Sequence, residues 1–178
     1  MADAVVIPGG AFGPAAGLLM YVGELVERRG ARVHRHSWSH DPPMEFGPRL
    51  EGWVRDEVWP LLETAGDRPL LIGKSLGTLT AALAAENSLP AVWLTPLLTA
   101  PWAAAAFDAA SAPFLLVGGT ADRLWDGRLA RRLTPYLLEV DGADHGMYVP
   151  GPLTDSIAVL ARVIAAVEEF LDAIRWPG

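Results

Sequence analysis

The sequence GKSLG at positions 73–77 constrains the fold of this chain more than any other segment. An apolar run at 69–73 leads into it, and an Ala-rich, helix-forming run at 76–87 follows it. This order predicts a buried strand that turns abruptly into a helix, with Ser75 on the turn. A side chain two residues before or after the serine would meet the backbone of a neighbouring strand or helix, so glycine is required at both places. The motif therefore predicts an α/β fold with a serine hydroxyl at the end of a strand.

Short apolar runs alternate with longer amphipathic runs along the rest of the chain. Strands are predicted at residues 4–8, 31–37, 69–73, 90–95, 113–118 and 135–140. Helices are predicted at residues 14–29, 47–65, 76–87, 126–133 and 153–175. A short helix or loop is predicted at residues 103–110. This alternation is typical of a three-layer α/β/α sandwich, with a mainly parallel sheet of about six strands between helices. No linker or repeat interrupts the pattern, so residues 1–178 are predicted to form a single domain.

Composition excludes several classes of protein. The 178 residues are 51% hydrophobic, enough to bury a substantial core. The net charge is −7 and no cluster of basic residues opposes it, so a nucleic-acid partner is not expected. The absence of cysteine excludes disulfides, thiol catalysis and cysteine-based metal sites.

Neither a membrane partner nor secretion is predicted. The uncharged stretch at 88–107 contains three prolines, so it is interpreted as a buried strand and a loop rather than a membrane-spanning helix. The N-terminus lacks the basic region of a signal peptide, and a cytoplasmic location is expected.

Two loops carry the residue types that would activate a serine hydroxyl. Serine is a weak nucleophile at neutral pH and needs a neighbouring base, which in turn needs an orienting partner. The sequence GGTAD at 118–122 follows the fifth predicted strand, and GADHG at 142–146 follows the sixth. Because ligands in open α/β sheets bind beyond the carboxyl ends of the strands, Ser75, Asp122 and His145 are expected to meet there.

The three segments GKSLG, GGTAD and GADHG, in this order, resemble the α/β-hydrolase superfamily over nearly the whole chain. The resemblance implies that Ser75 is the nucleophile, His145 the general base and then acid, and Asp122 the carboxylate that orients it. It implies acyl transfer through a covalent acyl-enzyme without a metal or organic cofactor. The first antiparallel strand pair of the family is missing, and little chain separates Pro96 from Pro113, where relatives insert a lid. The chain thus resembles a small, lidless, minimal esterase.

Other polar residues near these loops have alternative interpretations. Asp126 and Asp144 compete with Asp122, but Asp126 is expected to begin the next helix as its cap, and Asp144 to brace the histidine loop. Lys74 is expected to point away from the nucleophile and to be structural or solvated.

The remaining histidines, His34, His36 and His40, lie upstream of the serine, in the wrong place for its base. His34 and His36 would share one face of a strand, but no carboxylate pair is convincingly positioned beside them. They are interpreted as ordinary residues at a strand end, and no metal site is expected.

An oxyanion hole would need two backbone N–H groups. One is expected from Leu76, at the start of the helix after the nucleophile. The other is expected from the loop PGGAF at 8–12, with Gly10 favoured over Ala11. Relatives often carry His-Gly in this loop, and proline replaces the histidine at position 8. A plain tight turn would fit the same glycines.

The chain has seven tryptophans, an unusual number for its length. Trp38, Trp102 and Trp125 follow predicted strands on the active-site side, and with Phe12 they are candidates for an apolar acyl pocket. The alternative is that they fill the core where a lid is missing. The others suit helix–sheet packing, namely Trp53, Trp59, Trp93 and Trp176.

These observations predict a serine hydrolase that acts on a small or medium acyl ester or thioester. An open, lidless site would favour soluble short acyl substrates over aggregated lipid. Two alternatives stay open: a protein of this fold used for binding with little hydrolysis, or the same triad used for peptidase, C–C hydrolase or perhydrolase chemistry. The sequence predicts no oligomeric state.

Overall fold

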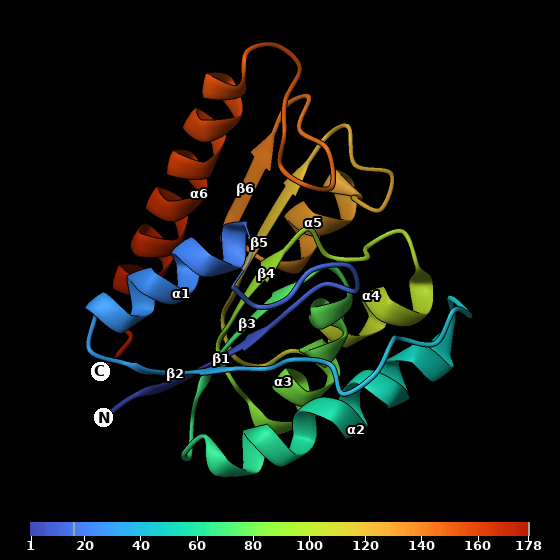
Figure 1. Cartoon of the computed structure of the whole chain (residues 1–178), viewed down its shortest axis with the longest axis vertical. Coiled ribbons are helices and arrows are strands. Elements are labelled where there is room, and N and C mark those ends of the chain that lie inside the picture. Colours follow the sequence, from blue (N-terminus) through green and yellow to red (C-terminus); the bar gives the residue numbers. More distant parts are fainter. Residues whose placement is uncertain (16, 178) are drawn as a thin grey trace.

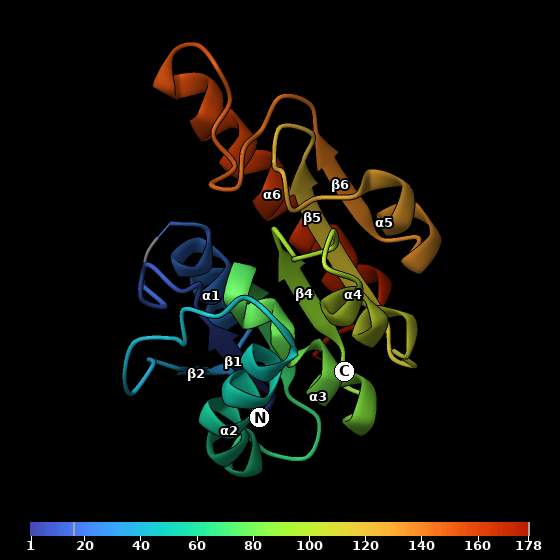
Figure 2. The same ribbon diagram turned by 90° about the vertical axis from the view of Figure 1, so that its right-hand side faces the viewer.

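A parallel β-sheet forms the centre of the molecule. A computed structural model describes residues 1–15 and 17–177, and these form a sheet of six strands in the order β2-β1-β3-β4-β5-β6 (Figure 1). Every neighbouring pair is parallel, so all strands end at the same edge (Figure 2). The strands are β1 (Asp3–Ile7), β2 (Arg32–Arg35), β3 (Leu70–Lys74), β4 (Ala91–Leu94), β5 (Phe114–Gly119) and β6 (Leu137–Val140).

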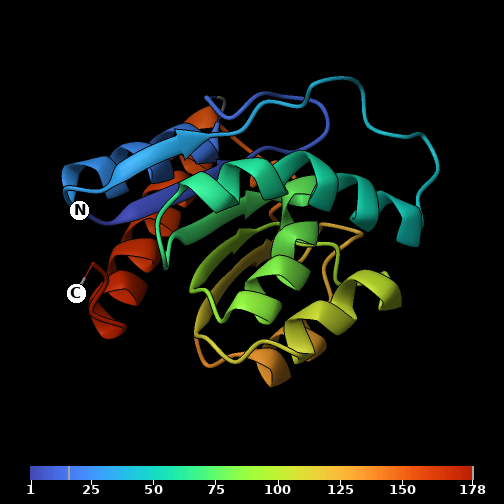
Figure 3. The ribbon, with the colours of Figure 1, turned by 90° about the horizontal axis from the view of Figure 1, so that it is seen from below.

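Helices cover both faces of this sheet, as the sequence predicted. One face packs against α1 (Leu18–Arg28) and α6 (Leu153–Ala173), and the other against α2, α3, α4 and α5 (Figure 3). The helices of the second face are α2 (Pro48–Thr64), α3 (Ala81–Asn87), α4 (Pro101–Asp108) and α5 (Gly127–Leu133). The predicted three-layer α/β/α sandwich is therefore confirmed.

Side chains of the central strands alternate between the two helical layers. Val5 and Leu71 belong to the core under α2–α5, whereas Val6, Leu70 and Ile72 belong to the core under α1 and α6. All five are fully buried, as expected for strands covered on both faces. Strand side chains alternate between the two faces, so Lys74, two residues after Ile72 in β3, also faces the α1–α6 layer.

The strand order creates a crevice at one place along the carboxyl edge. From β1 the chain crosses to β2 on one side of β1, and later returns to β3 on the other side. Ligand sites of open α/β sheets lie where the order reverses in this way, here between the carboxyl ends of β1 and β3. The elbow (residues 73–77) and the loop after β1 therefore meet at this crevice.

Two predicted helices differ from the structure by more than two residues or in helix type. The helix expected at 14–29 begins only at Leu18, after Gly17 takes a positive φ of 56°; residue 16 lies outside the described residues. The helix expected at 76–87 starts as a 3₁₀-helix, η1 (Ser75–Thr80), and becomes α-helical as α3. Here the Thr78 hydroxyl donates to the Ser75 carbonyl, three residues earlier, which suits the tighter winding.

The connection from β4 to β5 holds only the short helix α4, so no lid is evident in the part of the chain that the structure describes. None of the helices within residues 1–15 and 17–177 combines the length and apolarity needed to cross a membrane.

Candidate active site

Ser75 occupies a strained turn between β3 and η1. Its φ is 50°, in the left-handed region that residues other than glycine rarely adopt. A Cβ on Gly73 would lie 2.6 Å from the carbonyl oxygen of Gly77 and 2.8 Å from the Trp93 ring. A Cβ on Gly77 would collide with the carbonyl of Ile7 in β1. The two glycines are therefore required for the reason that the motif indicates: backbone passes too close for a side chain.

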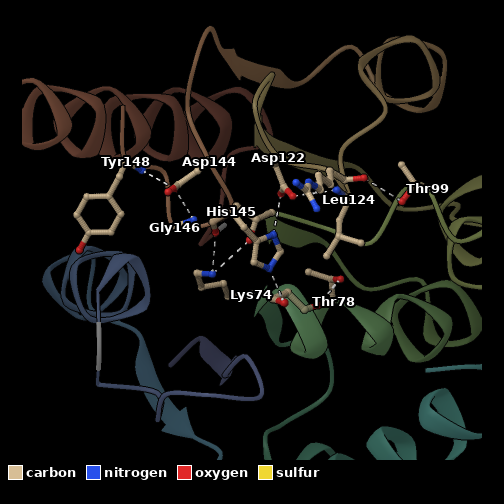
Figure 4. A network of polar contacts seen from close by, with 12 residues as sticks. Lys74, Thr78, Thr99, Asp122, Leu124, Asp144, His145, Gly146 and Tyr148 are labelled. Atoms are coloured by element: carbon tan, nitrogen blue, oxygen red, sulfur yellow. Dashed lines mark hydrogen bonds and ion pairs between the residues drawn. The ribbon is translucent and has the colours of Figure 1, made fainter. Parts of the chain in front are cut away.

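His145 links Ser75 to Asp122. His145 Nε2 lies 2.7 Å from Ser75 Oγ, and His145 Nδ1 lies 2.7 Å from Asp122 Oδ2. The other carboxylate oxygen of Asp122 accepts a hydrogen bond from the Leu124 amide at 2.9 Å (Figure 4). Asp122 is buried, so little water competes for these bonds. The three predicted residues, from the ends of β3, β5 and β6, are thus brought together in the order needed for proton transfer from the serine.

The two competing carboxylates have the structural roles predicted for them. Asp126 caps α5 by accepting hydrogen bonds from the amides of Arg128 and Leu129, both at 3.0 Å. Asp144 accepts from the amides of Gly146 and Tyr148, at 2.8 and 2.9 Å (Figure 4). These bonds shape the loop that carries His145.

Lys74 fits the structural rather than the solvated alternative. Its ammonium donates to the carbonyl oxygen of His145 at 3.2 Å (Figure 4) and to Thr95 Oγ1 at 3.4 Å. The side chain therefore does not extend into solvent, because the loop after β6 folds over it. Burial lowers the pKa of Lys74, while the charges of Asp122 and Asp144 raise it.

The loop after β1 lies directly against Ser75. A Cβ on Gly9 would be 3.5 Å from Ser75 Cβ, and one on Gly10 would be 3.6 Å from a methyl carbon of Leu76. The indole N–H of Trp38 donates to the Gly9 carbonyl at 2.9 Å and holds this loop in place. Gly10 and Leu76 are therefore neighbours beside Ser75, and their amides remain the predicted oxyanion donors.

A cavity of about 370 Å³, here called the elbow cavity, opens beside Ser75 on the α1 side of the sheet. Its walls are residues 9–13 and 17–19 after β1, Lys74 and Ser75 of the elbow, and His145, Gly146 and Tyr148. Phe12, a candidate pocket residue, is part of this lining. Leu18, Leu19 and Tyr148 were not predicted, since nothing in their local sequence indicates on which side of the serine the cavity opens.

The three candidate pocket tryptophans lie elsewhere: none is among the described residues that line the elbow cavity. Trp125 is buried, and its indole N–H donates to Glu139 at 2.7 Å. Trp38 and Trp102 pack against the core under α2–α5, which is the opposite face of the sheet. The structure thus favours the alternative that these rings fill the core.

His36 Nε2 and His40 Nδ1 each lie 3.7 Å from a carboxylate oxygen of Glu57, while His34 has a different partner. His34 Nε2 pairs with Asp3 Oδ1 at 2.7 Å, and His40 Nδ1 with Ser39 Oγ at 2.6 Å. Within the described residues, no group of three or more histidine, cysteine, aspartate or glutamate side chains is arranged to hold a metal ion.

Comparison with known proteins identifies the fold. No protein-family model and no curated protein sequence matches the chain. A Xanthomonas campestris protein assigned to the α/β-hydrolase superfamily is 22% identical, with a TM-score of 0.67 over 97% of this chain and 99% of that one. An α/β serine hydrolase homologue from Coxiella burnetii is 12% identical, with a TM-score of 0.67 over 93% and 83% of the two chains. A Pyrococcus furiosus esterase is 14% identical, with a TM-score of 0.60 over 96% and 83%. The chain therefore has the α/β-hydrolase fold.

Proposed function

We propose that this protein is a serine hydrolase that cleaves a small or medium acyl ester or thioester. The observation that carries the proposal is the continuous hydrogen-bond chain from Ser75 through His145 to Asp122, with both links at 2.7 Å, beside a cavity large enough for a small acyl group. The likeness to a named esterase and to a serine hydrolase homologue supports the same class.

In the proposed reaction, His145 Nε2 accepts the Ser75 hydroxyl proton as Oγ attacks the substrate carbonyl. Asp122 stabilises the imidazolium that forms. The negative oxygen of the tetrahedral intermediate accepts hydrogen bonds from the amides of Leu76 and Gly10, and each such donor typically contributes about 2.7–4 kcal/mol. His145 then gives its proton to the departing alcohol or thiol. Water, activated by the same histidine, releases the acyl group from Ser75.

The test is the variant Ser75→Ala. We expect it to lose labelling by a fluorophosphonate probe and to lose turnover of activated short-chain esters, because the attacking oxygen is gone. Ser111→Ala, at an exposed serine hydrogen-bonded to Ser88, is the matched control and should label like the wild type. Circular dichroism checks that both variants fold. Strong labelling of Ser75→Ala would overturn the proposal.

A further inference from the structure

Lys74 places a cation in the wall of the elbow cavity, next to the nucleophile. It is the only lysine among the 14 lysine and arginine residues of the chain. An ammonium has three N–H donors, and the two contacts of Lys74 are long bonds to neutral oxygens, the His145 carbonyl and the Thr95 hydroxyl. A donor therefore remains for a ligand in the cavity that this side chain lines.

The charge of Lys74 is not matched by an ion pair. Asp122 and Asp144 lower the cost of placing it there, but each carboxylate already accepts its hydrogen bonds from other groups. Among the described residues, none of the ion pairs includes Lys74. A partly buried ammonium without an anionic partner is costly, and an anion that enters the site would offset that cost.

The rest of the elbow cavity suits an uncharged chain. Among the described residues that line it none is acidic, and most are glycines or apolar side chains such as Phe12, Leu18 and Leu19. Apart from His145, which the reaction uses, Lys74 is the single cation of this wall. In a protein with a net charge of −7, such a local cation is the feature that would select an anionic ligand.

We infer that the substrate carries a carboxylate, and that the Lys74 ammonium binds it while Ser75 attacks the ester or thioester carbonyl. The inference rests on the proposed function and names its substrate class. Lys74 and Ser75 are adjacent in the chain and line one cavity, so the inferred carboxylate and the scissile carbonyl belong to one short ligand. A monoester of a short dicarboxylic acid, or an ester whose alcohol bears a carboxylate, has this form.

Binding is tested without turnover in the Ser75→Ala variant. Incorporation of ε-¹⁵N-lysine labels a single ammonium without modifying it, because Lys74 is the only lysine of the chain. We expect glutarate to shift the ¹⁵N NMR signal of Lys74 saturably and to raise the pKa of its ammonium. Neutral glutaramide should change neither the signal nor the pKa. A Lys74 signal that glutarate leaves unmoved, or that both ligands move equally, would overturn the inference.

Specificity is tested with two pairs of esters. One pair compares the 4-nitrophenyl monoester of glutaric acid with 4-nitrophenyl hexanoate, and the other compares 3-carboxy-4-nitrophenyl butyrate with 4-nitrophenyl butyrate. Each kcat/KM is divided by the uncatalysed rate of the same ester. In at least one pair we expect the wild type to favour the anionic ester by about 10- to 100-fold, as a charge-assisted hydrogen bond allows.

The ratio of the normalised kcat/KM values for the anionic and the neutral ester distinguishes binding of the carboxylate by Lys74 from a purely structural role. Neither rate alone does so. Lys74→Met should abolish the preference, and Lys74→Arg should keep it, because the arginine restores the cation. An unchanged preference in Lys74→Met would overturn the inference even if both rates fall together. Absence of any preference in the wild type, with neutral esters still hydrolysed by Ser75, would refute the inference and leave the proposed function intact.

Discussion

At the scale of single residues, the elbow stores backbone strain that its surroundings must sustain. Ser75 has a φ of 50°, a conformation that costs a residue other than glycine on the order of 1–3 kcal/mol. The close packing of Gly73 against the Gly77 carbonyl and the Trp93 ring keeps it there. Ser75 is thus positioned by backbone and ring atoms of the neighbouring elements.

Gly73→Ala should therefore damage both stability and activity. We expect about 1–3 kcal/mol of lost stability in urea unfolding, since a methyl group must displace backbone, and a marked fall in kcat on short esters as the elbow shifts. Gly52→Ala is the matched control, because no atom lies within 4 Å of its added Cβ on the exposed side of α2. That change should stabilise the protein by roughly 0.5–1 kcal/mol. A stable, fully active Gly73→Ala variant would contradict this account.

At the scale of elements, the packing of α2 against the chain leaving β2 encloses a histidine. His36 is 8% exposed, and its Nε2 has no hydrogen-bond partner in the described part of the chain. Glu57 of α2 is the nearest opposite charge, 3.7 Å away, and the Trp38 ring packs edge-on against the imidazole. Burial lowers the pKa of His36, and Glu57 raises it by less.

This contact predicts a dependence of stability on pH. In the unfolded chain a histidine titrates near 6.5, while the folded protein keeps His36 neutral to lower pH. Below about pH 6.5 the unfolded state therefore binds more protons, so the free energy of unfolding falls as pH falls toward the folded pKa. Urea unfolding between pH 7.5 and 5 should show a shallower loss for His36→Leu than for the wild type. Equal slopes in the two proteins would argue against a protonation penalty at this site.

At the scale of the whole molecule, the reversal of strand order between β1 and β3 determines where the site lies. It brings the loop after β1 beside the elbow and opens the cavity on the α1 side. No lid is evident at this edge in the described residues, because the β4–β5 connection holds only α4. Ser75 is itself partly exposed.

The absence of an evident lid predicts kinetics without activation at a lipid–water interface. Rates on soluble short-chain esters should saturate smoothly with concentration and show no jump where a longer-chain ester begins to aggregate, because no lid must open at an interface. Assays with 4-nitrophenyl butyrate and with emulsified triolein, at matched enzyme concentration, measure this. Strong activation by the emulsion would show that another element covers the site.

Local patterns in the sequence were sufficient for the strand–turn–helix order, for the two glycines of the elbow, and for Asp126 and Asp144. They also singled out Ser75, Asp122 and His145, because parallel strands deliver their loops to one edge whatever the details of packing.

The tertiary structure alone decided the side of the sheet on which the site opens. That choice follows from the strand order and from the alternation of side chains, and both depend on contacts between segments distant in sequence. It moved Trp38, Trp102 and Trp125 into or against the core, and it brought Leu18, Tyr148 and Lys74 to the wall of the elbow cavity.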